Sequence, residues 1–101
     1  MRNMREDERI EMVADVRADL VARIGVDESA VRVVTVEAVT WRDGSLGCPE
    51  PGRSYTQALV PGVRIVLEVD GATYDYRGTH RGGFRLCTNP MDGEIPGLEP
   101  T

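Results

Sequence analysis

Apolar residues in the first quarter of the chain recur at the spacing of an amphipathic helix. The five that define the pattern are three or four residues apart: Ile10, Val13, Val16, Leu20 and Ile24. This spacing places them on one face of a helix, and the acidic residues before them favour a helix N-terminus. Gly25 suits a left-handed C-terminal cap. The pattern predicts a helix over residues 4–24 whose apolar face covers a core or, alternatively, contacts a partner.

The middle of the chain has the composition of β-strands. Residues 31–41 are rich in β-branched side chains, which favour extended backbone. Residues 54–60 are a further strand candidate, and Pro61-Gly62 is expected to break it in a tight reversal. Residues 63–69 predict a strand with one apolar face, because every second position is apolar. That face holds Val63, Ile65, Leu67 and Val69.

The remaining chain predicts two turns and two short strands. Asp70-Gly71 is a strong signal for a two-residue type I′ hairpin turn, and residues 72–77 follow as a strand. A glycine-rich turn over residues 78–83 leads to a last strand over residues 84–87. The Pro- and Gly-rich tail over residues 89–101 is expected to be a partly ordered arm without regular structure.

The order of these elements predicts an α+β fold. One N-terminal helix packs on one face of a four-stranded antiparallel sheet with meander connections. A chain of 101 residues supports a single core. We therefore expect one domain over residues 1–88 and a tail over residues 89–101.

Composition and charge exclude several functions. The net charge is −5, whereas non-specific binding of nucleic acid needs a basic face. All 12 basic residues are Arg, so Schiff-base chemistry and a phosphate-loop lysine are excluded. No apolar run is long enough to cross a bilayer. We expect no nucleic-acid or membrane partner, no cofactor, and a monomer or weak dimer.

The first residues of the chain are charged and lack the apolar core of a signal peptide. They predict a cytoplasmic location, with an exported domain whose leader has been removed as the alternative.

Residues 41–62 combine Gly and Pro with the only Trp and one of the two Cys. Loops of special backbone on a rigid scaffold are frequent binding sites, so this segment is the expected working surface. Asp43 is expected to cap a turn that contains Ser45. Trp41 is either a hydrophobic plug or the anchor of a binding edge. Strand alternation places it on the face of Val33, Thr35, Glu37 and Val39.

The second part of this surface is the sequence QALVPG, residues 57–62. The expected reversal at Pro61-Gly62 places Leu59, Val60 and Pro61 near a hairpin tip, close to Gln57. Apolar side chains at such a tip either fold inward or form a wedge for the cleft of a partner. Both alternatives remain open at this level.

Cys48 and Cys87 are the two cysteines of the chain. A disulfide between them would close a long loop and tie the segment 41–62 to the last strand, but a reducing cytoplasm would keep both thiols free. With His80, the only histidine, they could also form a small thiol or metal site, although the sequence has no CxxC or HxxxH element. Pro49 removes an amide that an oxyanion hole after Cys48 could use.

Three arginines gather around the last predicted hairpin: Arg77, Arg81 and Arg85. Such a group is either a solvated, ion-paired face or a site for a carboxylate or phosphate.

The segment WRDGSLGCPEPG, then YTQALVPGVRIVLEV and YDYR, resembles a small uncharacterised bacterial and archaeal protein family. Its members have a W-x-D-x-S-L-G-C-P core, then Y-x-Q, P-G-x-x-I-x-L and Y-x-Y. The resemblance covers half to two-thirds of the chain. It implies a site that includes Tyr55 and Gln57 without naming an activity. In exported relatives it would make a Cys48–Cys87 bridge reasonable.

The order of one helix and four antiparallel strands is also similar to the cystatin arrangement. In cystatins a Gln-x-Val-x-Gly hairpin enters the cleft of papain-like proteases, and Gln57, Leu59, Val60 and Gly62 echo that motif. This chain has one extra residue and a Pro there. Its single Trp lies elsewhere.

We therefore expect a binding module and not an enzyme, with a protein partner and a protease-inhibitor-like wedge as its sharpest form. The alternative is a thiol or metal protein that uses Cys48, His80 and Cys87. The expected binding residues are Trp41, Asp43, Ser45, Tyr55, Gln57, Leu59, Val60 and Pro61.

Overall fold

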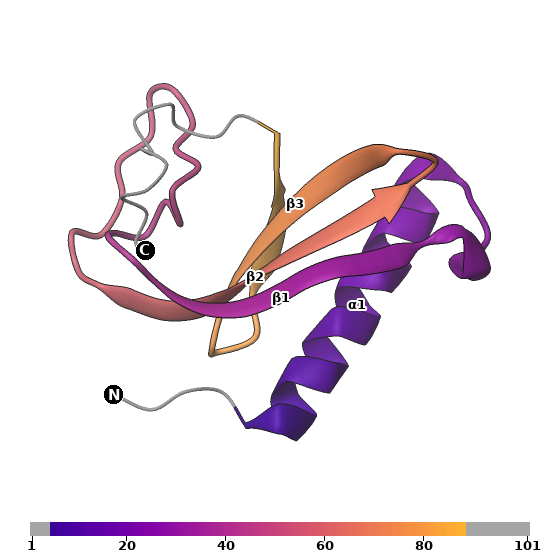
Figure 1. Ribbon diagram of the computed structural model, residues 1–101. Helices are drawn as coiled ribbons and strands as arrows, with labels where there is room; N and C mark the ends of the chain where they lie inside the picture. Colours follow the sequence, from indigo (N-terminus) through magenta and orange to yellow (C-terminus); the bar gives the residue numbers. More distant parts are fainter. Residues whose placement is uncertain (1–4, 89–101) are drawn as a thin grey trace.

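The computed structural model describes residues 5–88, and the expected tail over residues 89–101 lies outside them. One helix packs against one face of a four-stranded sheet (Figure 1). The strands are antiparallel neighbours in the order β1-β2-β3-β4, which confirms the predicted α+β fold. The elements are α1 (Glu6–Ile24), the short 3-10 helix η1 (Glu28–Ala30), β1 (Arg32–Trp41), β2 (Val60–Val69), β3 (Ala72–Thr79) and β4 (Phe84–Cys87).

Helix α1 ends as its sequence predicts. Gly25 has the left-handed φ of 69°, and its amide donates to the carbonyl oxygen of Val21 at 2.9 Å. At the other end, the Glu8 carboxylate accepts a hydrogen bond from the Arg5 amide at 2.9 Å, which satisfies a donor before the first turn. None of the helices within residues 5–88 is long and apolar enough to span a membrane.

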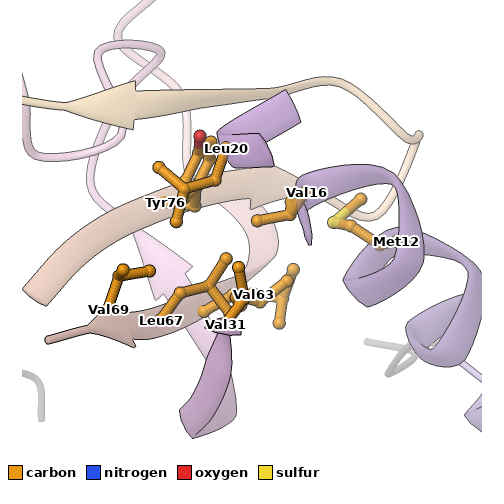
Figure 2. Close-up of a cluster of buried hydrophobic side chains, with 9 residues drawn as sticks. Met12, Val16, Leu20, Val31, Val63, Leu67, Val69 and Tyr76 are labelled. Carbon is orange, nitrogen blue, oxygen red and sulfur yellow. The ribbon is translucent and has the colours of Figure 1, made fainter. Parts of the chain in front are cut away.

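The core lies between α1 and the central strands. Met12, Val16 and Leu20 point from α1 toward the sheet (Figure 2). The predicted apolar face of β2 is fully buried beneath them, and Tyr76 of β3 completes the cluster. Ile10 and Ile24, which were expected in this face, are exposed. The buried row follows the four-residue spacing from Met12, and Ile10 lies two residues before it on a different side of the helix. Ile24 continues the row but is the last residue of α1.

The hairpin between β2 and β3 has the predicted turn. Asp70 and Gly71 have φ values of 51° and 86°, as both central residues of a type I′ turn require. Val69 pairs with Ala72 across it. The apolar positions of β2 therefore stay in register with the helix-facing positions of β3.

The predicted strand over residues 54–60 and the reversal at Pro61-Gly62 are wrong. Strand β2 begins at Val60 and continues through both residues without a break. Pro61 fits because it is the second residue of the strand, where the loss of one amide donor is tolerated, and its carbonyl oxygen accepts from the His80 amide at 3.0 Å. Gly62 pairs with both Val39 and Thr79.

The alternation along β1 is also interrupted. Val33 pairs with Leu67, but Thr35 pairs with Val66, so the register shifts between them. One extra residue moves all following side chains to the opposite face. Thr35, Glu37, Val39 and Trp41 share the outer face of the sheet, as predicted. Val33 packs against the core on the helix side instead.

Candidate functional site

The segment between β1 and β2 is a compact loop with closed ends. Trp41 and Val60 are paired at its base. Further out, the Gly44 amide donates to the carbonyl oxygen of Thr56 at 2.9 Å. Residues 44–56 thus form a loop of the Ω type, whose ends lie close together. We call this segment the Ω loop; it leaves the sheet as irregular backbone in Figure 1.

A side-chain cap starts the Ω loop. The Asp43 carboxylate accepts from the Ser45 amide at 2.9 Å and from its hydroxyl at 2.6 Å, which is the predicted turn. Ser45 and Leu46 are buried. Leu46 and Gly47 both have left-handed φ values, 57° and 72°. This first half of the loop is therefore folded inward onto the sheet.

Arg77 of β3 holds the bend at residues 46–47. It is only 4% exposed. Its Nη1 donates to the carbonyl oxygens of Leu46 at 3.1 Å and of Gly47 at 2.8 Å. Its Nε and Nη2 donate to the carboxylate of Asp75 at 3.3 and 3.1 Å. A buried guanidinium thus has donors committed both to the loop and to a counter-ion.

Arg85 of β4 holds the residues on either side of that bend. Its Nη2 donates to the carbonyl oxygens of Ser45 at 2.7 Å and of Cys48 at 2.6 Å. Two arginines from neighbouring strands therefore bind four successive loop carbonyls. Arg77 and Arg85 are engaged in the fold, and only Arg81 of the predicted arginine group is exposed in the last turn.

A disulfide fixes the same half of the loop. The Sγ atoms of Cys48 and Cys87 lie 2.09 Å apart, and the two Cα atoms 5.8 Å apart. Both cysteines are buried. Cys87 is the last residue of β4. The bond connects the loop to the strand that also carries Arg85.

Trp41 lies between the Ω loop and the sheet. Its indole Nε1 donates to the carbonyl oxygen of Gly78 at 3.1 Å. A Cβ atom at Gly62 would lie 2.7 Å from Nε1, so the indole occupies space that a side chain would fill. The Trp41 side chain is half-buried, and its polar group is satisfied within the fold.

The second half of the loop faces outward. Tyr55 is half-buried, and its hydroxyl accepts from the Glu50 amide at 3.0 Å. The guanidinium groups of Arg53 and Arg85 lie 5.9 and 6.0 Å from the centre of its ring. Gln57 is exposed, and Leu59 is 67% exposed.

The predicted binding residues thus divide into two groups. Trp41, Asp43 and Ser45 build the support of the loop. Tyr55 lies in its outer half, and Gln57 and Leu59 are exposed in the residues that lead from the loop into β2, where Val60 and Pro61 are half-buried. Sequence patterns did not reveal the supporting roles of Arg77 and Arg85, because no local motif links a strand arginine to carbonyls 30 to 40 residues earlier.

The three residues of the alternative thiol or metal site are engaged in other contacts. The two sulfurs are bonded to each other, and Nδ1 of His80 lies 3.2 Å from the carbonyl oxygen of Pro61. Within residues 5–88 there is no group of three or more His, Cys, Asp or Glu placed to hold a metal ion.

Fold and site together define a class: a small α+β domain with one helix on an antiparallel sheet and a disulfide-tied Ω loop between its first two strands. A family model, the domain of unknown function DUF8738, matches residues 13–87. The chain belongs to this family. Neither a curated protein nor a solved structure matches the chain.

Proposed function

We propose that this protein is a binding module whose working surface is the outer half of the Ω loop and the residues that lead into β2. The observation that carries the proposal is the contrast between the two halves of this segment. The inner half, residues 45–48, is fixed by two arginines and a disulfide. Leu59, which lies between the Ω loop and β2, is 67% exposed.

A fixed loop favours binding because little conformational freedom is lost when a partner is engaged. Tyr55 is ordered by Glu50 and by two guanidinium groups, and ordered aromatic residues are frequent anchors in interfaces. Leu59 supplies an apolar side chain for a pocket. The partner we propose is a protein with an apolar cavity and a polar rim.

The sharpest form of the proposal is a protease inhibitor that inserts Leu59 into an active-site cleft. Residues 57–62 contain no cystatin-like hairpin, because β2 runs through Pro61 and Gly62. The inhibitor form therefore rests on an ordered loop that carries one apolar residue to the cleft. The disulfide supports an exported protein, because disulfides persist outside the reducing cytoplasm.

The test is inhibition of a panel of papain-like and serine proteases by the intact protein and by Leu59→Ser. Burial of a leucine contributes roughly 1.5–3 kcal/mol, so the substitution should raise the inhibition constant by about tenfold or more. Ile10→Ser is the matched control, because Ile10 is an exposed apolar residue on α1. It should leave inhibition unchanged.

A panel that the intact protein does not inhibit would remove the inhibitor form. The broader proposal is tested by amide hydrogen exchange of the Ω loop. The amides of Gly44, Leu46 and Cys48 donate to carbonyl oxygens, so they should exchange slowly. Exchange as fast as in an unstructured peptide would show that the loop is not ordered in advance, and the proposed working surface would be wrong.

A further inference from the structure

Strand β1 is an open edge of the sheet within residues 5–88. It lies at one end of the strand order, and among the described residues it pairs only with β2. It has ten residues, which is long for an edge strand. Val34 and Val36 on this strand are 44% and 37% exposed. Long, apolar edges pair with other strands unless a feature prevents it.

The register shift in β1 places its side chains in an unusual pattern. Arg32 pairs with Glu68 and Glu37 pairs with Arg64. Because Glu68 and Arg64 are four residues apart on β2, Arg32 and Glu37 lie on the same, outer face. By the same argument Val33 and Val36, opposite Leu67 and Ile65, lie on the helix face. Without the extra residue, side chains five positions apart would lie on opposite faces.

We propose that β1 pairs antiparallel with β1 of a second copy of this chain, in the register that sets Arg32 opposite Glu37 of the other copy. In this register Val33 faces Val36 of the second copy on the helix side. Each contact occurs twice, because a twofold interface is the same patch on both subunits. A twofold axis perpendicular to the sheet keeps both α1 helices on one side.

Charge complementarity selects this register and this occupant. A shift of one residue would bring charged side chains against valines of the other face. The required partner is an extended segment that carries an acid opposite Arg32 and a base opposite Glu37. Between these two charges the segment must also carry β-branched residues. Strand β1 has this pattern itself. Both side chains reach the solvent, since Arg32 is 70% and Glu37 48% exposed at the side chain, and each also forms an ion pair within its own chain, with Glu68 and Arg64.

The interface is separate from the proposed binding surface. The register shift lies near the start of β1, and the Ω loop follows its end. In the dimer the two Trp41 residues would lie about 40 Å apart, at about 3.3 Å per strand residue. The dimer would carry two working surfaces at opposite ends of an eight-stranded sheet, which suits bivalent binding.

The test is sedimentation equilibrium of the full chain and of two charge variants, over concentrations from roughly 10 µM to 1 mM, the range of a weak dimer. Arg32→Glu brings two acids together at each pair, and Glu37→Arg brings two bases together. Each variant alone should dissociate about tenfold more readily, because like charges opposed across strands are destabilising. Arg81→Glu, a charge reversal of equal size at an exposed residue between β3 and β4, away from the β1 edge, is the matched control and should dimerise normally.

The decisive sample is a mixture of the two charge variants. The new acid at position 32 of one variant then faces the new base at position 37 of the other, so a heterodimer of about the original affinity should form. The intrachain contacts of Arg32 with Glu68 and of Glu37 with Arg64 are not restored by mixing, so recovery reports the contact between copies. An unaltered chain that stays monomeric at about 1 mM, or a dimer indifferent to both variants, would overturn the proposal. So would a β1 edge that becomes protected only when a foreign extended peptide is added.

Discussion

The guanidinium of Arg77 lies over the indole ring of Trp41, with 5.1 Å between its Cζ atom and the ring centre. The two residues come from different strands, β3 and β1. Between them they support the Ω loop, because Arg77 binds its carbonyls at residues 46 and 47. Gly47 makes this possible: a Cβ atom there would lie 2.7 Å from the Arg77 Nη1. A stacked cation and ring are thus the base on which the candidate site is built.

Replacement of Arg77 by Met keeps an unbranched side chain that reaches about as far as Nε, and it removes the guanidinium donors. The carbonyl oxygens of Leu46 and Gly47 then lose a partner, and each buried unsatisfied group costs about 1–3 kcal/mol. We expect a loss of roughly 3 kcal/mol in the free energy of unfolding, measured by urea denaturation. Emission from Trp41, the only Trp, should also change, since its cation partner is absent.

Arg81→Met is the control, because Arg81 is exposed in the last turn. It should alter stability by no more than about 0.5 kcal/mol. Equal effects of the two substitutions would contradict the role of Arg77 as the support of the loop.

The periodic elements of the fold were predictable from the sequence because their signals are local. The buried face of β2 follows from one residue in two, and the Asp70-Gly71 turn follows from two positions that need positive φ. The closure of the Cys48–Cys87 pair was one of several alternatives, since the pairing of cysteines depends on tertiary structure.

Errors arose where tertiary contacts decide the local structure. Pro61-Gly62 was expected to end a strand, yet Gly62 is held between two neighbouring strands. The register shift after Val33 has no sequence signature in a run of β-branched residues. The working surface that the sequence predicts within the segment 41–62, with Tyr55 and Leu59, stays a prediction. The support from Arg77 and Arg85 could not be predicted, because it depends on contacts between distant parts of the chain.

Gly62 is a position where a single methyl group should be costly. A Cβ atom there would lie 2.1 Å from the Gly78 carbonyl oxygen and 2.7 Å from the Trp41 Nε1. Backbone and indole must both move, so Gly62→Ala should lose about 3 kcal/mol, the upper end of ordinary overpacking. Gly83→Ala is the matched control, since no atom of residues 5–88 outside its immediate chain neighbours lies within 4 Å of its Cβ position. Urea denaturation of both variants measures the difference, and similar midpoints would contradict the close packing of Trp41 on Gly62.

The contact between Asp19 and Tyr76 should make stability depend on pH. The Tyr76 hydroxyl donates to the Asp19 carboxylate at 2.7 Å, and this hydrogen bond, with help from Arg23, lowers the pKa of Asp19. Because the folded pKa is below the unfolded value, the stabilisation is present above about pH 4 and is lost as the pH falls through the folded pKa. Asp19→Asn should therefore cost about 1 kcal/mol at neutral pH.

The difference between the original chain and Asp19→Asn should shrink as the pH is lowered below about 4. Denaturant titrations at several pH values measure it. Asp15→Asn on the same helix is the control, since Asp15 is exposed, and it should have little effect at any pH. A pH-independent cost of Asp19→Asn would contradict a contribution from the carboxylate charge. At high pH the stability should depend on Tyr76, because burial and the Asp19 carboxylate raise the pKa of its hydroxyl. The stabilisation that comes from the protonated hydroxyl should be lost as the pH rises above about 10.

The disulfide between Cys48 and Cys87 spans a sequence separation of 39 residues. In the chain-entropy account a loop of this length stabilises the fold by about 4 kcal/mol. Replacement of both cysteines by Ala should lower the melting temperature by roughly 15–30 °C for a domain of this size. A strong reductant should have nearly the same effect on the original chain in differential scanning calorimetry, and no effect on the double variant.

The double variant supplies the internal control, because any response of that protein to reductant cannot come from this bond. An original chain whose melting temperature is unchanged after complete reduction would show that Arg77 and Arg85 hold the Ω loop without covalent help, and that the disulfide contributes little to stability.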